Sequence, residues 1–563
     1  MSYLFQVNIG PVQDFIASAR RTRDLYFGSW LLSYLSRTVA VQIVGKNGLD
    51  SLIFPAPEKE ELDAKDSNVA NKIVALIEQD PKELAECVQT RIKERVREIR
   101  DEAYKNIWLP KADLEMAYKQ IDDLIEFLWV ALPYDRQNQE PGYYETMRNQ
   151  LEALMAARKN TRDFHAVPWK RMYVPKSSID GQLESVIPED RYPTRKLSSA
   201  EKQVKISELY QRFHAGPAER LSGVDLLKRH GTRLQERNTD LSKQQEQNTT
   251  APDFEALSTS HVATLPFLKR LESIQGQGLD YVREVWDSYI KLFKEAAAFP
   301  EAVRKVPQGY VEHSILGQHD GGMLFEDQLA DMLYLPAFDT TTMTRMQPVK
   351  NALRNFYQSV DKQLAAPIRP NPYYVLLQAD GDSMGKVIDA HAQNGYDKHR
   401  EFSKALSSFA EGVDTIIEKH EGALVYAGGD DVLAFLPLHT VLQCASRLAE
   451  QFRKELKDFA DQEAKPTLSV GIAIVHHLDT LKEARKLAKQ AENRAKGVDG
   501  KNALAITISK RSGESYNIAG SWETKEASQA IGDYLGKLIN FCCDGIIPGG
   551  TAYELRDLAV RLN

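Results

Sequence analysis

Cysteine is scarce in this sequence, and its spacing forms no recognisable pattern. The four cysteines lie at positions 87, 444, 542 and 543. They include no Cys-x-x-Cys pair, and four scattered thiols are too few for a disulfide framework. The sequence therefore argues against a disulfide-rich secreted fold and against a cysteine-ligated zinc site, and we expect no bound zinc.

Long apolar runs and an excess of positive charge are also lacking. No apolar run approaches 18 residues and no signal peptide is evident, which predicts a cytoplasmic protein without a membrane partner. The 72 basic and 79 acidic side chains give a net charge of −7. This charge excludes a generally basic nucleic-acid coat, so any contact with nucleic acid has to be local or shared with partner proteins.

The most informative motif that is present is Gly428-Gly429-Asp430-Asp431. Apolar runs at 423–427 and 432–438 flank it, which predicts a β-hairpin with two carboxylates at its tip. The two glycines allow a backbone to approach a bulky ligand closely. Taken alone, the motif is also compatible with a solvated hairpin turn.

A second acidic motif, Asp380-Gly381-Asp382, follows an apolar run at 373–377. Taken alone, its aspartates could cap a helix that begins near Ser383. Together, the two motifs place acidic groups on two turns at one edge of a sheet. Such groups can hold two Mg²⁺ or Mn²⁺ ions about 4 Å apart, as in palm-type polymerases and nucleotide cyclases. The predicted metal ligands are Asp380, Asp382, Asp430 and Asp431.

A basic turn at 496–502 joins a predicted helix at 481–495 to a predicted strand at 503–508. Its lysines, Lys496 and Lys501, can offset the charge of a bound triphosphate. The alternative interpretation is an ordinary solvated turn.

Two adjacent histidines, His476 and His477, follow a predicted strand that begins at residue 468. We identify no cysteine or acidic partner for them. We therefore interpret the pair as a surface or packing feature, not as a metal site.

The predicted elements divide the chain into four segments of an α+β fold. The first begins with a strand at 3–9 and a helix from Gly10-Pro11, whose end carries a cluster of arginines (Arg20, Arg21 and Arg23) that suits the helix dipole. This first segment is mainly helical from 58 to 127. The third segment, at 366–515, follows the order of strands and helices of a ferredoxin-like palm. The segments are a first palm with helical insertions at 1–205, a helical middle domain with a polar loop (232–253) at 206–365, a second palm at 366–515 and a short helical C-terminal segment at 516–563.

These motifs together resemble the large, polymerase-like subunit of type III CRISPR effector complexes, in the Cmr (III-B) branch. The resemblance extends over nearly the whole chain, because its landmarks occur in the order that the family has them. The landmarks are the segments 9–24, 28–33, 219–229, 258–260, 379–385, 424–431 and 501–505.

The resemblance implies two palms packed face to face, with ATP bound at their junction and joined into cyclic oligoadenylate. It also implies antiviral defence in a complex with other Cmr subunits and guide RNA, activated by target RNA. Only the second palm is expected to hold the metals, because the strand at 3–9 contains no carboxylate. The expected catalytic residues are Asp380, Asp430 and Asp431. The expected nucleotide-binding residues are Gly381, Asp382, Gly428, Gly429, Lys496, Lys501, Ser258 and Thr259.

Several features depart from the family pattern or leave alternatives open. The chain begins at the first palm, without the histidine–aspartate nuclease domain of many members. Ser222 and Asp225 occupy a segment where zinc-binding cysteines are expected, and the helical tail is short. For Ser258 and Thr259, a helix N-cap or a loop hydrogen bond is an equally good interpretation. The whole chain could instead be a non-catalytic scaffold for guide and target RNA, or a palm enzyme with another nucleotide product.

Overall fold

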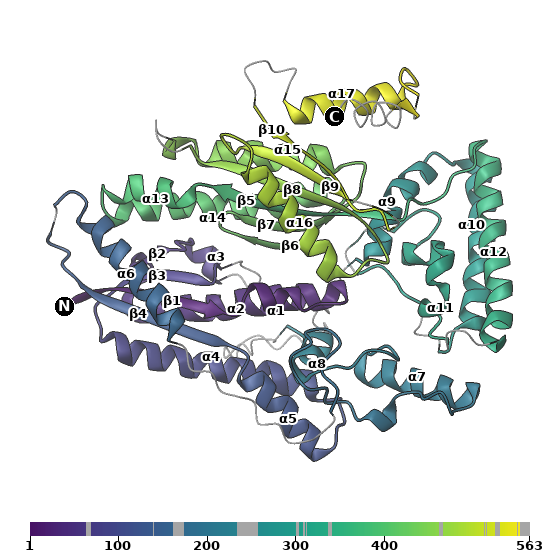
Figure 1. Ribbon diagram of the computed structural model, residues 1–563, viewed down its shortest axis with the longest axis horizontal. Coiled ribbons are helices and arrows are strands. Elements are labelled where there is room, and N and C mark those ends of the chain that lie inside the picture. Colours follow the sequence, from purple (N-terminus) through teal and green to yellow (C-terminus); the bar gives the residue numbers. More distant parts are fainter. Residues whose placement is uncertain are drawn as a thin grey trace, which may run out of the picture.

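The chain folds into two stacked β-sheets with helices around them, as the computed structural model shows (Figure 1). The structure describes residues 1–63, 69–138, 140–161, 174–233, 257–299, 303–307, 310, 312–335, 340–460, 465–511, 513, 515–523, 530–548 and 550–551. The predicted polar loop lies outside them from residue 234 onward. No helix in these described segments is long and apolar enough to cross a membrane.

The first sheet is antiparallel and has the strand order β2-β3-β1-β4, which is that of a ferredoxin-like fold. Its strands are β1 (Ser2–Gly10), β2 (Leu52–Phe54), β3 (Lys72–Ile77) and β4 (Glu126–Tyr134). The crossover helices are α1 (Gln13–Ala17), α2 (Thr22–Asn47), α4 (Pro81–Tyr104) and α5 (Lys111–Asp122). The short α3 (Lys59–Asp63) precedes β3, and α6 (Tyr143–Asn160) follows β4.

Two predictions for this segment are wrong. Strand β3 lies inside the stretch predicted to be helical, because its short apolar run is buried between two other strands. The arginine cluster lies at the N-terminal end of α2, so the argument from a helix C-terminus does not apply. The Asp24 carboxylate accepts hydrogen bonds from the backbone N–H groups of Arg20 and Arg21, at 3.1 and 3.0 Å, and starts α2 there.

The middle segment is helical and stands at the right of Figure 1. Its core contains large side chains from two long antiparallel helices, including Trp286, Tyr289 and Phe356. The helices are α7 (Ser199–Phe213), α8 (Gly223–His230), α9 (Thr259–Leu271), α10 (Gly276–Ala296), α11 (Leu329–Met332) and α12 (Thr340–Leu364). Helix α8 packs elsewhere, because Leu226 and Leu227 belong to the core of the first palm.

The second sheet has the order β10-β9-β8-β5-β7-β6, in which the four strands β8 to β6 repeat the ferredoxin-like arrangement. Its strands are β5 (Tyr373–Asp382), β6 (Ala423–Gly428), β7 (Asp431–Leu436), β8 (Thr467–His476), β9 (Ala503–Ile508) and β10 (Tyr516–Ser521). The helices are α13 (Met384–Ala392), α14 (Tyr396–Lys419), α15 (Val441–Glu455), α16 (Leu481–Lys496) and α17 (Ile531–Cys543). The predicted α+β fold with two palms is confirmed.

Strand β10 corrects one predicted boundary. The sequence predicted a helical tail from residue 516, but β10 pairs antiparallel with β9 and extends the second sheet. Most of its side chains are exposed at the sheet edge, so the segment carries little apolar pattern. Helix α17, which follows it, is the helical part of the tail among the described residues.

The two palms share one apolar core. It joins Phe5, Phe27 and Leu31 of the first palm to Tyr374 and Phe435 of the second. Helices α14 and α15 cover the opposite face of the second sheet. The palms therefore pack face to face, as predicted.

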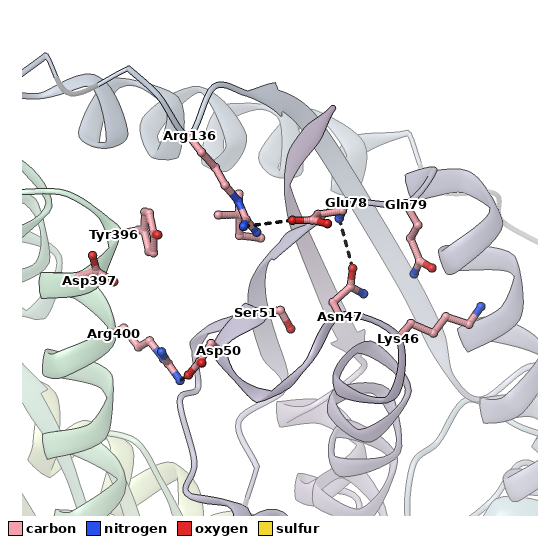
Figure 2. Close-up of a pocket in the computed structure, with 11 residues that line it drawn as sticks. Lys46, Asn47, Asp50, Ser51, Glu78, Gln79, Arg136, Tyr396, Asp397 and Arg400 are labelled. Atoms are coloured by element: carbon pink, nitrogen blue, oxygen red, sulfur yellow. Dashed lines mark hydrogen bonds and ion pairs between the residues drawn. The ribbon is translucent and has the colours of Figure 1, made fainter.

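Polar contacts at the rim of this interface surround a cavity of about 640 Å³ (Figure 2). Arg400 of α14 pairs with Asp50 of the first palm at 2.6 Å, and Arg136 pairs with Glu78 at 3.1 Å. None of the four predicted metal ligands lines this cavity, so it is distinct from the acidic motifs.

Candidate active site

The two acidic motifs meet at one edge of the second sheet. Strands β5 and β7 pair with Ala379 opposite Val432, and a two-residue turn, Gly429-Asp430, joins β6 to β7. Glycine is required at position 381, because a Cβ there would lie 2.8 Å from the Cβ of Asp430. The backbone of one motif thus touches the side chain of the other.

The turn glycines have different roles in this arrangement. Gly429 has a φ of +65°, a left-handed conformation that favours glycine. Gly428 lies against the hydroxyl of Tyr426, so an added Cβ would collide with the ring. Both glycines therefore shape the hairpin that carries Asp430, whatever else approaches it.

The electrostatic potential at this edge of the second sheet is negative. Burial and the nearby Glu492 carboxylate raise the pKa of Asp430 to about 6. The pKa of Asp431 is also raised, by loss of surrounding water and by the charges of Asp430 and Glu492. Asp431 is exposed, so solvent weakens the rise of its pKa. A divalent cation would relieve the repulsion, and carboxylate oxygens are the ligands that Mg²⁺ and Mn²⁺ prefer.

Glu492 is a residue of this site that the sequence interpretation missed. Its side chain is fully buried and lies 2.7 Å from Lys489 Nζ and 3.5 Å from Lys496 Nζ. Helix α16 approaches the sheet closely enough to place Glu492 there, because β8 has a glycine, Gly471, beneath it. A signal was available: position 492 falls one turn after the buried Ala488, on the apolar face of an amphipathic helix.

The predicted basic turn reaches the carboxylates. Lys496 Nζ pairs with Asp380 Oδ2, and burial together with Lys501 lowers the pKa of Lys496. Lys501 Nζ donates to Ser383 Oγ at 3.0 Å, just after β5. The structure thus brings both predicted lysines to the end of β5.

Asp382 has a different environment from the other three aspartates. It is 2% exposed, and its carboxylate accepts hydrogen bonds from Thr467 Oγ1 at 2.8 Å, from Ser469 Oγ at 2.8 and 2.9 Å and from the backbone N–H of Asn502 at 3.0 Å. These donors occupy most of its lone-pair positions. Asp382 therefore ties the basic turn to β8 and β5, and its geometry differs from that predicted for a direct metal ligand.

Ser258 and Thr259 do not join this cluster. Ser258 caps α9 by accepting from the backbone N–H of His261 at 2.9 Å, and Thr259 Oγ1 donates to the carbonyl of His477 at 3.4 Å. Asp380 lies opposite Ser469 of β8, which precedes His477 by eight residues. At roughly 3.3 Å per residue along a strand, Asp380 and the contact between Thr259 and His477 are about 26 Å apart. The helix-cap alternative describes Ser258 in this structure.

Two further groups of residues that were noted in the sequence make contacts within the chain. Ser222 and Asp225 form a capping box at the start of α8, in the segment where zinc cysteines were expected. The arginine cluster contacts groups near α8: Arg20 and Arg21 lie 3.4 and 3.7 Å from Glu219, and Arg23 donates to the backbone carbonyls of Arg229 and Gly231. These arginines hold α8 on the first palm.

Two segments of the chain match models of known protein families. Residues 373–505 match the family model described as Cas10/Cmr2, second palm domain, and residues 4–101 match that described as CRISPR-associated protein Cmr2, N-terminal. The CRISPR system Cmr subunit Cmr2 of Pyrococcus furiosus is 26% identical over 92% of this chain. The chain spans 63% of the length of that relative.

Two solved structures agree in fold. Both are chains of the type III-B Cmr-beta complex, in the apo state (TM-score 0.65) and bound to cognate target RNA (TM-score 0.63). Each is 14% identical and covers 99% of this chain, which in turn covers 75% and 76% of those chains. The fold and the acidic edge define a two-palm protein of the polymerase- and cyclase-like class. Within that class, the segments 373–505 and 4–101 of this chain are similar to the Cas10/Cmr2 family.

Proposed function

We propose that this chain is the subunit of a type III-B effector complex that converts ATP into cyclic oligoadenylate when target RNA binds. The observation that carries the proposal is the convergence of Asp380, Asp430 and Asp431 with Lys496 and Lys501 at one edge of the second palm. A scaffold without chemistry has no evident use for several carboxylates gathered beside two lysines. The matches of residues 373–505 and 4–101 to the Cas10/Cmr2 family models support the same function.

In this proposal, Asp380, Asp430 and Asp431 would hold two Mg²⁺ or Mn²⁺ ions. Such ions activate an attacking hydroxyl and stabilise a departing pyrophosphate. Lys496 and Lys501 offset the charge of the triphosphate. Asp382 fixes the turn that carries Lys501, and Glu492 keeps Lys496 directed toward the carboxylates.

The proposed partners are other Cmr subunits, guide RNA and target RNA. Solved relatives with this fold are named as parts of the Cmr-beta complex, one of them bound to cognate target RNA. The net charge of −7 also favours shared binding, because an acidic chain gains little from counterion release on its own. We therefore expect the isolated chain to be slow and the complex to respond to RNA.

The test uses the assembled complex with ATP, Mn²⁺ and either matching or scrambled target RNA, with products identified by mass spectrometry. We expect cyclic oligoadenylate only with matching RNA. The variant with both Asp430→Ala and Asp431→Ala should assemble normally but lose at least 1000-fold in rate, since loss of metal assistance costs several kcal/mol. Asp280→Asn on α10 is the matched control and should be fully active.

Four outcomes would contradict the proposal. Undiminished synthesis by the double variant would remove the metal assignment. A different nucleotide product would show that the proposed reaction is wrong. An assembled complex that makes no nucleotide product would favour the scaffold alternative. Full-rate synthesis by the isolated chain without RNA would contradict the regulatory part.

A further inference from the structure

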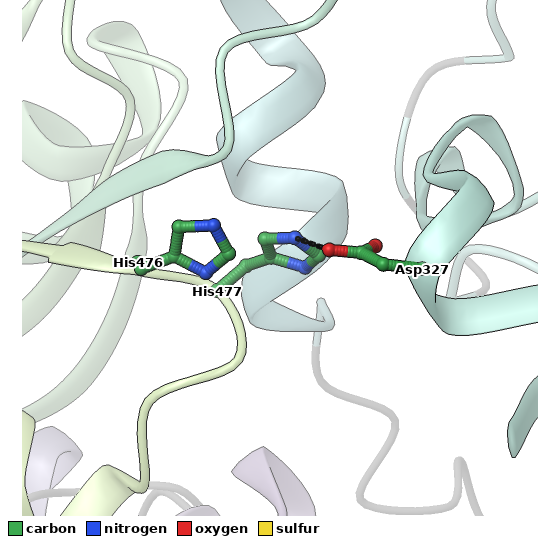
Figure 3. Close-up of side chains that lie close together, drawn as sticks. All are labelled: Asp327, His476 and His477. Atoms are coloured by element: carbon green, nitrogen blue, oxygen red, sulfur yellow. Dashed lines mark ion pairs between the residues drawn. The ribbon is translucent and has the colours of Figure 1, made fainter. Parts of the chain in front are cut away.

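A second cluster of potential ligands lies where the second palm meets the middle domain. His476 ends β8, His477 follows it, and Asp327 belongs to the short 3₁₀ helix Glu326–Gln328 (Figure 3). One ligand atom from each residue lies within 4.8 Å of the others. The interpretation of the histidine pair as having no acidic partner is therefore wrong: the partner is distant in the sequence and adjacent in the fold.

His477 presents an unsatisfied nitrogen to this cluster. Its side chain is fully buried, and its Nε2 has no hydrogen-bond partner among the described residues. Nε2 lies 3.7 Å from Asp327 Oδ2, which is too long for a hydrogen bond. Buried polar atoms are normally satisfied, so this nitrogen requires an explanation.

The neighbouring hydroxyl determines which ring nitrogen of His477 carries the proton. Ser260 Oγ donates to Gln328 Oε1 at 3.0 Å and lies 3.0 Å from His477 Nδ1. A hydroxyl has a single proton, so Nδ1 of His477 is the donor to Ser260. Nε2 is then left with a lone pair that faces a carboxylate. Two acceptors directed at each other are satisfied by a cation between them.

We propose that His476, His477 and Asp327 bind one divalent transition-metal ion of the Zn²⁺ type. Two imidazoles and a carboxylate are a common ligand set for such ions. The hydrogen bond from His477 to Ser260 orients the ring, as outer partners of metal-ligating histidines do. His476 Nδ1 accepts a 3.2 Å hydrogen bond from the Leu478 N–H. His476 completes the set when that bond is released, which leaves Nδ1 free to bind the ion or to take the proton so that Nε2 binds it.

The ion would connect the end of β8 to the middle domain. Ser260 of α9 already contacts His477 from that domain and donates to Gln328, so the site lies on an existing contact. The expectation of no zinc rested on cysteine spacing alone, and it does not apply to a site made of histidine and aspartate.

The test uses the full chain, stripped with a chelator and titrated with Zn²⁺ and with Co²⁺. We expect one ion per chain by calorimetry, a visible absorption band for bound Co²⁺, and a higher unfolding temperature with metal than without. The Asp430→Asn, Asp431→Asn double variant should retain this binding, which separates the site from the proposed catalytic metals.

Asp327 is half-exposed, so Asp327→Asn removes a ligand with little risk to folding. We expect it to weaken Zn²⁺ binding at least tenfold, and His476→Gln to do the same. Asp331→Asn, an exposed neighbour on α11, is the matched control and should bind like the original chain. Absence of stoichiometric binding, or an affinity in Asp327→Asn and His476→Gln as high as in the original chain, would overturn the proposal.

Discussion

The ammonium group of Lys496 pairs with the carboxylate of Asp380 and so joins the last turn of α16 to the end of β5. The same ammonium lies 3.5 Å from the buried carboxylate of Glu492. Lys496 therefore has two anionic partners, one at the proposed metal edge and one behind it. A divalent ion at Asp380 would compete with Lys496 for that carboxylate, while Glu492 would still hold the lysine nearby.

Replacing Lys496 by methionine should reveal this competition. We expect Lys496→Met to slow cyclic oligoadenylate synthesis at least tenfold, about 1.4 kcal/mol, because a charge beside the triphosphate is lost. The Mn²⁺ concentration for half-maximal rate should fall at the same time. Rates measured over a Mn²⁺ series test both effects. Lys486→Met, an exposed lysine on the same helix, should change neither, and an unchanged rate in Lys496→Met would contradict the role.

Glu492 should contribute to stability as well as to rate. Glu492→Gln removes its charge-assisted contacts with Lys489 and Lys496, and we expect a loss of about 2 kcal/mol in unfolding free energy. The loss stays modest because both lysines are partly exposed. Glu483→Gln, which breaks an exposed ion pair with Lys486 on the same helix, should lower the unfolding free energy by under about 1 kcal/mol. Denaturant unfolding measures the difference, and equal effects of the two changes would show that burial of Glu492 is unimportant.

Asp382 offers a test that separates a positioning role from metal ligation. Asp382→Asn replaces an acceptor by an amide facing Thr467 and Ser469, and we expect a loss of about 1–3 kcal/mol in stability. The backbone N–H hydrogen of Asn502 should exchange faster with solvent, because its hydrogen-bond acceptor is weakened. Unchanged stability combined with weaker Mn²⁺ binding would instead identify Asp382 as a direct ligand.

Glu219 should make stability depend on pH in a defined direction. Burial raises its pKa, but Arg229 and Arg21 outweigh burial and lower the pKa from 4.5 to about 2. A lowered pKa in the folded state stabilises the fold above pH 4.5, and this contribution is lost as the pH falls through about 2.

The comparison with Glu219→Gln isolates this effect. We expect the variant to be about 3 kcal/mol less stable at pH 7, because Arg229 is fully buried and loses an anionic partner. The difference should shrink at pH 3 and vanish below about pH 2. Unfolding curves at several pH values measure it. Glu189→Gln, which breaks an exposed pair with Arg220, should show little difference at any pH.

The acidic edge could be predicted from the sequence because each of the two acidic motifs directly follows a buried apolar run. Strand β3 could not, because its apolar run lies among charged helical residues and has no local feature that distinguishes it. The partners of the arginine cluster and of His477 depend on tertiary contacts. Glu219 is far from Arg21 in the chain, as Asp327 is from His477, so no spacing rule connects them.

Helix α8 makes the first palm discontinuous as a folding unit. Lys228 Nζ donates to the carbonyls of Phe15 and Ser18, and Arg229 pairs with the buried Asp24 at 2.7 Å. A fragment that ends at residue 205 would leave Asp24 without its counter-charge. Recombination that exchanges the first palm between relatives therefore has to transfer α8 with it, although the two are separate along the gene.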